Sequence, residues 1–415
     1  MPASLSQFAR SLNTETSFDV LAVARRLKAQ GKDVIELQIG DSPFPTPGHA
    51  RAAGIDAIQQ HQSHYCPSLG LTEFRETIAR HYSAEFGVPI TAAHVVVAPG
   101  AKPFEQFFCE AFLDPGDEVL AFTPLFPTYV PNIHRRGAVP VYSVLRQERQ
   151  FRPEIADVER FVTSPRAKAI FLNSPHNPTG GVAAAEDLRA IADLVRGRDI
   201  AVFCDEPYCH MVWEGRHHTL LAEDGMLEQC VAAYTFSKSY SMSGWRLGYA
   251  VAAPRVVDAI GKMINTTLSC TPPIVQWAGR AALDRDAAER DDAMRRFHAK
   301  VERLVGALRN VPDVTVLMPK GTFYVFPDVS PICRRLGITS HGLAMFLLEA
   351  ADDQIGVACL GGECFGPAGQ GFLRFSCAEP DDRLAAAIAF FQEAVTRTDR
   401  VQRYLETHAK YRLAQ

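Results

Sequence analysis

The sequence lacks several features that mark membrane, secreted or nucleic-acid-binding proteins. No apolar run in its 415 residues approaches the ~18 residues of a membrane span. A formal charge of −4 gives no electrostatic reason to bind nucleic acid or an anionic membrane. The start, MPASLSQFARSLNTETSF, has no apolar core of the kind that a secretory signal contains. We therefore expect a cytoplasmic protein with neither nucleic-acid nor membrane partners.

Two further absences restrict the chemistry. The ten cysteines form no CxxC pair and no Cys/His spacing typical of a metal site, so we expect free thiols and no metal. Cys204 and Cys230 lie in apolar, strand-like runs and are expected to be small core residues. No G-x-G-x-x-G opens a helix after a strand, which argues against a nicotinamide dehydrogenase.

The first two thirds of the chain alternate between apolar strands and amphipathic helices. The strand-like runs are HVVVAP, DEVLAF, KAIFLN, DIAVFC and CVAAYT, and helical patterns such as FEQFFCEAFL and LRAIADLV separate them. Continuously apolar strands between amphipathic helices indicate a parallel sheet that is covered on both faces. We predict an α/β fold, with residues 48–284 as the large domain.

The last third has a different pattern. A long, charged amphipathic helix begins near residue 284, and its charges are expected to form a solvated face. The runs VTVLMP, TFYVFPD, IGVACL and GFLRFSCA, with a helix near HGLAMFLLEAAD, predict a small α+β domain over residues 285–415. Residues 1–47 are expected to join that domain. The tail RVQRYLETHAKYRLAQ is predicted to be helical and exposed.

Four predicted strands end in polar or ionisable residues. These ends are VVVAPGAK, AIFLNSPHNPTGG, IAVFCDEPY and VAAYTFSK. Ligands of open parallel sheets bind at the carboxyl ends of the strands, so we expect one composite pocket there. Each segment has a plainer reading when taken singly, as a turn, a helix cap or a solvated lysine. Their joint occurrence favours a site.

The order of these segments resembles that of a known family. NSPHNPTG, DEPY, TFSKSYSMSGWRLGY and FLRFSCA resemble the class I aminotransferases of the fold-type-I pyridoxal-phosphate-dependent enzymes. YCPSLGLTEFRETIA and LQIGDSPFPTP resemble two further segments of that family, and the resemblance covers about residues 35–380. It implies pyridoxal 5′-phosphate as cofactor. It also implies a large domain with a mostly parallel, seven-stranded sheet between helices, plus the small domain.

The resemblance implies a role for each residue around the cofactor ring. Lys238 would bond to the cofactor aldehyde and shuttle the substrate α-proton. Asp205 would keep the pyridine nitrogen protonated, so that the ring can accept electrons. Asn177 and Tyr208 would hydrogen-bond the phenolic oxygen, and Phe126 would stack on the ring. The family commonly has tryptophan or tyrosine where this chain has Phe126, which keeps the stacking but removes a polar group.

The resemblance also implies a phosphate site and a shared interface. Arg246 offers a planar fork for the phosphate, and backbone amides at the start of a helix offer further donors. The residues expected at the phosphate are Gly100, Ala101, Lys102, Thr235 and Arg246, and Ser237 is also expected to bind the cofactor. Tyr65 would reach the same phosphate from the neighbouring subunit, which implies a homodimer with shared active sites.

Substrate binding is expected to depend on Arg374. It would bind the α-carboxylate, assisted by the Gly40 amide and Asn177. The segment INTTLSCTPP carries no arginine that could bind a second carboxylate. That segment, with Phe18 and Phe44, suggests a neutral or mixed-character amino acid. His176 is expected to pack within its turn.

Three functions remain to be distinguished. The leading prediction is reversible transfer of an amino group from an L-amino acid to a 2-oxo acid by a ping-pong mechanism. The same residues could support a β-elimination or an oxidation of an amino acid. A non-catalytic, cofactor-binding regulator is disfavoured, because no basic helix-turn-helix segment precedes residue 35. The donor, the acceptor and the pathway stay open.

Overall fold

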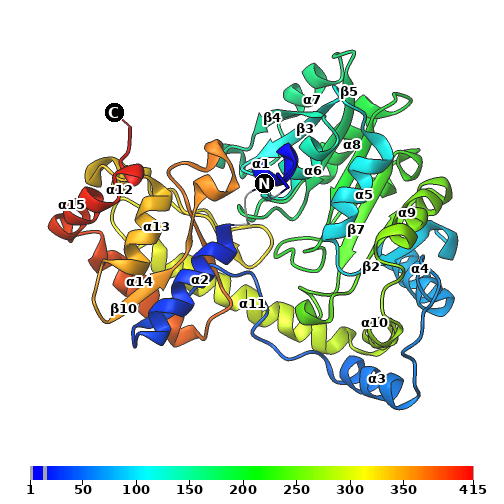
Figure 1. Ribbon diagram of the computed structural model, residues 1–415, viewed down its shortest axis with the longest axis horizontal. Helices are drawn as coiled ribbons and strands as arrows, with labels where there is room; N and C mark the ends of the chain where they lie inside the picture. Colours follow the sequence, from blue (N-terminus) through cyan, green and yellow to red (C-terminus); the bar gives the residue numbers. More distant parts are fainter. Residues whose placement is uncertain (1–2, 13–15, 415) are drawn as a thin grey trace.

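A seven-stranded sheet forms the centre of the larger of two lobes (Figure 1). The structure, a computed structural model, describes residues 3–12 and 16–414. In spatial order the strands are β2 (Val95–Ala98), β8 (Gly248–Ala252), β7 (Cys230–Thr235), β6 (Ala201–Asp205), β5 (Ala167–Asn173), β3 (Glu118–Thr123) and β4 (Val139–Val144). Only β8 runs antiparallel to its neighbours. The predicted mostly parallel sheet is confirmed.

Helices cover both faces of this sheet. Successive residues of β6, Val202 and Phe203, are fully buried in two separate apolar clusters, as expected for a strand between two helical layers. On the Phe203 side lie α5 (Lys102–Phe112) and α9 (Pro254–Thr267). The opposite cluster includes residues of α4 (Thr72–Phe86), α7 (Ile155–Phe161), α8 (Ala185–Val195) and α10 (Pro273–Arg285). Helix α3 (Gly48–Gln59) packs on α10, and α6 (Tyr129–Arg135) lies beside α5.

The strand β4 was not among the predicted strands. It contains Pro140 and forms an edge of the sheet, with several side chains exposed. An edge strand tolerates proline and need not show a continuous apolar run, so its sequence gives a weak strand signal.

The smaller lobe joins the two ends of the chain. β1 (Asp33–Glu36) pairs in parallel with β10 (Ile355–Ala358), so the N-terminal segment contacts the C-terminal region. A second sheet has the order β11 (Leu360–Gly361), β12 (Leu373–Ser376), β9 (Tyr324–Val325). The helices here are α2 (Thr16–Ala29), α12 (Ser330–Leu336), α13 (Ser340–Glu349), α14 (Asp381–Ala394) and α15 (Thr398–Thr407). The exact domain limits stay a prediction.

A long helix, α11 (Ala287–Leu308), runs between the lobes, and short helix α1 (Gln7–Ser11) lies against the larger one (Figure 1). The prediction of an exposed tail is wrong for part of α15. Val401, Tyr404 and Leu405 are buried, because their i, i+3, i+4 spacing places them on one apolar face.

All ten cysteines are free thiols, and Cys204 and Cys230 are each 1% exposed, as predicted. Among the described residues, no helix combines the length and the apolar character that a membrane crossing requires.

Candidate active site

A cavity of about 510 Å³ lies at the carboxyl ends of β5, β6 and β7. Its walls include every residue predicted to bind the cofactor or the substrate carboxylate, except Gly100 and Tyr65. Those lining residues are Gly40, Ala101, Lys102, Phe126, Asn177, Asp205, Tyr208, Thr235, Ser237, Lys238, Arg246 and Arg374. The chain therefore brings together residues that are far apart in sequence.

Lys238 follows the end of β7 and presents its amine to this cavity. The Nζ atom donates a hydrogen bond to the carbonyl oxygen of Gly40 at 2.5 Å. It also lies 5.9 Å from the ring centroids of both Tyr208 and Phe323. The amine is thus held by a neutral carbonyl and aromatic rings at the cavity wall, where a small molecule could reach it.

Asp205 ends β6 and is 7% exposed. Its Oδ2 atom accepts a hydrogen bond from the hydroxyl of Tyr129, and Asn173 donates to its backbone carbonyl at 2.8 Å. Burial, together with the charge of Glu206, raises the pKa of the Asp205 carboxyl to about 6, although the Tyr129 hydrogen bond and the charges of Lys102 and Lys238 act in the opposite direction. A cationic group in the cavity would compensate the buried carboxylate.

Arg374 lies in β12 with 4% of its surface exposed. Its guanidinium donates to Asn177 Oδ1 at 2.9 Å and to the carbonyl of Gln38 at 2.6 Å. The Cζ atom lies 4.2 Å from the ring centroid of Tyr324 and 5.0 Å from that of Phe365. These contacts fix the plane of the fork, which suits the binding of a carboxylate.

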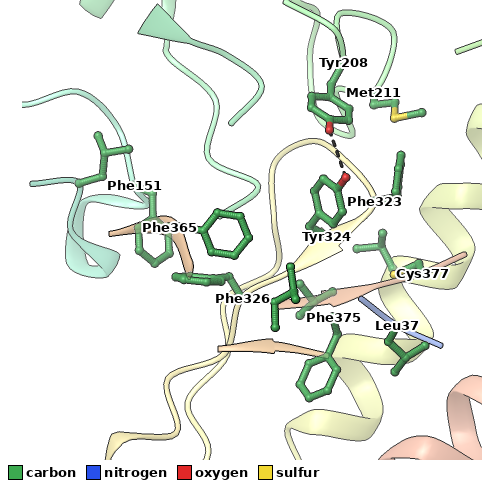
Figure 2. Close-up of a cluster of buried hydrophobic side chains, with 14 of the residues drawn as sticks. Leu37, Phe151, Tyr208, Met211, Phe323, Tyr324, Phe326, Phe365, Phe375 and Cys377 are labelled. Carbon is green, nitrogen blue, oxygen red and sulfur yellow. Dashed lines mark hydrogen bonds between the residues drawn. The ribbon is translucent and has the colours of Figure 1, made fainter. Parts of the chain in front are cut away.

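A pair of tyrosines closes the cavity on the side of the smaller lobe. Figure 2 shows the hydroxyl of Tyr208 facing that of Tyr324, and the two oxygens are 3.2 Å apart. The position of Tyr324 requires a glycine at position 40, because a Cβ atom there would lie 1.7 Å from the Tyr324 hydroxyl oxygen. Any larger residue at position 40 would displace this tyrosine.

Cationic and hydroxyl groups gather at another part of the wall. Arg246 donates to Ser237 Oγ at 3.4 Å, and Thr235 donates to the same oxygen at 2.8 Å. Gly100 has a φ of +90°, and a Cβ atom there would lie 2.4 Å from Nη2 of Arg246. The Gly100 amide already donates to the carbonyl of Ala98 at 2.7 Å. Gly100 therefore contributes a close approach to Arg246 rather than a free donor.

Sequence reasoning missed Tyr129, Asn173 and Tyr324. Asn173 is the last residue of the predicted strand KAIFLN, and its Oδ1 atom accepts from the Asn177 amide at 2.9 Å. A search of every strand end would have found Asn173. The signal for Tyr129 is weaker, because it begins α6, away from any strand end.

The remaining predicted residues divide into several groups. Phe18 lines the cavity, whereas Phe44 packs on Phe297 with ring centroids 4.9 Å apart. His176 is buried and its Nδ1 atom lies 2.7 Å from Thr179 Oγ1, which agrees with packing in its turn. Burial lowers the pKa of His176 to about 3. Tyr65 is 88% exposed and outside the cavity.

Comparison with known proteins assigns the family. The family described as aminotransferase class I and II matches residues 32–390. The chain belongs to this family. It is 32% identical to an aspartate aminotransferase of Pyrococcus abyssi, over 90% of this chain and 92% of that protein. It is 34% identical to a probable aspartate/prephenate aminotransferase of Aquifex aeolicus, over 92% of this chain and 96% of that protein.

A solved structure agrees in fold. The aspartate aminotransferase of Thermus thermophilus with maleate superposes with a TM-score of 0.88 at 31% identity, covering 95% of this chain and all of that one. The protein is therefore a pyridoxal-5′-phosphate-dependent aminotransferase of fold type I, and the predicted family, fold, activity and cofactor are confirmed. The cavity fits the cofactor, because it offers an amine for the aldehyde, a cation with hydroxyls for the phosphate, and a buried carboxylate.

The raised pKa of Asp205 predicts a stability cost in the cofactor-free aminotransferase. Its folded-state pKa of about 6 exceeds the usual 3.8, so the cost of burying the carboxylate is complete above pH ~6 and vanishes below pH ~4. We expect cofactor-free Asp205→Asn to be more stable than cofactor-free wild type by about 2–3 kcal/mol at pH 7. Urea unfolding of both proteins at pH 7 and at pH ~4 measures the difference in the free energy of unfolding. If the difference at pH ~4 equals that at pH 7, the prediction is contradicted.

Proposed function

We propose that the enzyme transfers the amino group of an L-amino acid to a 2-oxo acid in two half-reactions of a ping-pong mechanism. The observation that carries this proposal is the position of the Lys238 amine in one cavity with Asp205 and Arg374. When bound, pyridoxal 5′-phosphate supplies a ring that accepts the electrons released at the substrate Cα atom. The protein supplies the groups that bind and orient both molecules and move the proton.

The residues at the cavity wall take distinct roles in this proposal. Lys238 would hold the cofactor through its amine, and the free amine would remove the substrate α-proton and return it. Asp205 would keep the ring nitrogen protonated, and Asn177 and Tyr208 would donate to the phenolic oxygen. Phe126 would cover one ring face. Arg246, Thr235 and Ser237 would bind the phosphate, with the amides of Ala101 and Lys102 at the start of α5.

Arg374 binds the substrate α-carboxylate. Its hydrogen bonds to Asn177 and to the Gln38 carbonyl hold the guanidinium in place before the substrate arrives. A preorganised fork loses less side-chain entropy on binding, which favours a bidentate contact. The Gly40 amide assists at the same end of the cavity.

The substrate side chain faces apolar groups in this proposal. Phe18 and Ile39 line the cavity, and the segment 264–273 contains no arginine. The named relatives act on aspartate and, in one case, prephenate, and the T. thermophilus structure contains the dicarboxylate maleate. In contrast to these relatives, we propose that this enzyme prefers uncharged or mixed-character amino acids over aspartate and glutamate, because Phe18 and Ile39 are apolar and the segment contains no arginine for a second carboxylate.

A panel of single amino acids tests both activity and preference. We expect several uncharged amino acids to convert the holoenzyme to its amine form, which changes the cofactor absorbance. A strict preference for aspartate or glutamate would contradict the proposed substrate class. Conversion by no amino acid would contradict transamination, and release of pyruvate and ammonia without an oxo-acid acceptor would favour β-elimination.

The exposed Tyr65 supports a homodimer with shared sites. It is 88% exposed and does not line the cavity of its own chain, so in this proposal it would reach the phosphate bound by a second copy of the chain. We expect Lys238→Ala and Tyr65→Ala each to be inactive at limiting cofactor. Mixing the two after dissociation should restore roughly a quarter of the sites, because half of the dimers are then mixed and carry one intact site each.

The matched control mixes Lys238→Ala with Arg374→Ala. Both of these residues line the cavity of a single chain, so a mixed dimer contains no intact site and should stay inactive. Equal recovery in both mixtures, or a monomer in sedimentation, would contradict the shared-site proposal.

A further inference from the structure

Glu206 directly follows Asp205 but has no role in the proposed reaction. Consecutive residues at a strand end point to opposite faces of the sheet, so Asp205 lines the cavity and Glu206 does not. Glu206 is only 3% exposed. Burying a carboxylate costs free energy unless it is paired or hydrogen-bonded, so the surroundings of Glu206 must stabilise its charge.

Three donors surround the Glu206 carboxylate. Tyr234 donates to Oε2 at 2.5 Å, His217 Nε2 lies 2.7 Å from the same oxygen, and Thr219 donates to Oε1 at 3.0 Å. All three partners are buried, with Thr219 at 3%, Tyr234 at 2% and His217 at 8% exposed. A carboxyl group that accepts three hydrogen bonds is stabilised in its ionised form.

The hydrogen bonds of His217 indicate which tautomer is present. Its Nδ1 atom is buried and has no hydrogen-bond partner among the described residues. A hydrogen on Nδ1 would be buried without an acceptor, so the tautomer with its hydrogen on Nε2 is favoured, and it donates to Glu206. The Glu206 donors are then neutral, and the carboxylate keeps a net negative charge behind Asp205.

The other ionisable groups nearby do not cancel this charge. On the Glu206 side they are Tyr82, Glu85, Cys204, Cys209, His210, His217, Tyr234 and Arg290, and on the Asp205 side Lys102, Tyr129, Tyr208 and Lys238. Arg290 and His210 are grouped with the other carboxylate, Glu85: His210 Nε2 lies 3.1 Å from Glu85 Oε1 and 3.0 Å from Arg290 Nη1. Burial raises the pKa of Tyr82 and Tyr234 well above the usual value, so both phenols stay neutral. The two lysines lie on the cavity side, where Asp205 is.

We propose that Glu206 is a positioning residue whose buried negative charge acts through Asp205 to retain the proton on the cofactor's pyridine nitrogen. Charges interact strongly in a buried region of low effective dielectric constant, so the second carboxylate adds to the attraction that Asp205 exerts on this proton. The inference rests on the proposed placement of Asp205 against that nitrogen. It assigns the buried group of Glu206, His217, Tyr234 and Thr219 to electrostatic tuning of the reaction.

The test follows the ring nitrogen directly. Wild type and Glu206→Gln are reconstituted with cofactor labelled with ¹⁵N at the ring nitrogen, and the ¹⁵N chemical shift is titrated without substrate. Glutamine keeps the size of the side chain and a carbonyl acceptor for Tyr234 but removes the charge. We expect the midpoint of nitrogen deprotonation to fall by about one pH unit, with kcat about tenfold lower and KM little changed.

Two further variants separate the effect of the charge from a structural effect. Tyr234→Phe removes a hydrogen bond from Glu206 but keeps its charge, so the midpoint should stay at the wild-type value or rise. A fall in this variant would overturn the proposal even if Glu206→Gln does not fold. Asp286→Asn removes a buried charge elsewhere, where Asp286 accepts the backbone amides of His49 and Ala50 at the start of α3, and it should leave the midpoint unchanged.

Asp205→Asn distinguishes the inference from the proposed function. If this variant lowers the midpoint and Glu206→Gln does not, the role of Glu206 is refuted and the placement of Asp205 stands. If neither variant changes the midpoint, Asp205 does not face the ring nitrogen, and the inference is refuted with that placement. An equal fall in Asp286→Asn would also overturn the role of Glu206.

Discussion

Lys238→Ala is expected to reduce kcat for amino transfer by at least about 10⁴-fold while the protein stays folded. The substitution removes the amine that bonds the cofactor and carries the α-proton. The variant loses the hydrogen bond that the Lys238 amine donates to the Gly40 carbonyl. Because this is a single hydrogen bond, the free energy of unfolding should change little. Stopped-flow absorbance of the amino-acid half-reaction measures the loss of rate.

Borohydride reduction provides a second measurement on the same variant. Reduction should attach cofactor permanently to the wild type and not to Lys238→Ala. Lys168→Ala is the matched control, because Lys168 lies at the start of β5 and pairs with Asp199 outside the cavity. It should trap cofactor as the wild type does. Trapped cofactor in Lys238→Ala would assign the covalent bond to another lysine.

Arg374→Lys is expected to lower kcat/KM for amino acids by about 10³-fold, mainly through KM. Lysine keeps the positive charge but loses the planar fork that Asn177 and the Gln38 carbonyl orient, and it loses the stacking on Tyr324. The loss should appear with amino acids and should be absent with the corresponding amine that lacks the α-carboxylate. Steady-state kinetics with such a pair measures the difference.

The control for this prediction is Arg383→Lys. Arg383 forms a bidentate ion pair with Asp33 on the surface, and it does not line the cavity. Its replacement should leave kcat/KM within about twofold of the wild type. Equal losses for the amino acid and for the amine in Arg374→Lys would show that Arg374 supports the structure of the site rather than the carboxylate.

The larger lobe was predictable because its strands are buried on both faces. Continuous apolar runs such as KAIFLN and DIAVFC reveal a central strand, and they became β5 and β6. The smaller lobe was less predictable. The run VTVLMP forms only an isolated bridge between Thr315 and Asp328, because non-local pairing and not local propensity decides which short runs become strands.

The residues that line the cavity were predictable as a set because each occupies a strand end or a motif of fixed order. Lys238, Asp205 and Arg374 follow this rule, and all three line one cavity. The residues that form hydrogen bonds with these side chains from other parts of the chain were not predictable. Tyr129 reaches Asp205 from the start of α6, and Tyr324 reaches Tyr208 from the smaller lobe.

The sequence by itself determined the family, the α/β class, the cofactor and most of the residues that line the cavity, since these depend on local patterns and on the order of motifs along the chain. Only the tertiary structure decided the burial and the partners of those groups. The pKa of Asp205, the orientation of the Arg374 fork and the buried hydrogen-bond partners of Glu206 all depend on distances between residues far apart in sequence. Desolvation and Coulomb interactions act through space, so their magnitudes exist only once the chain has folded.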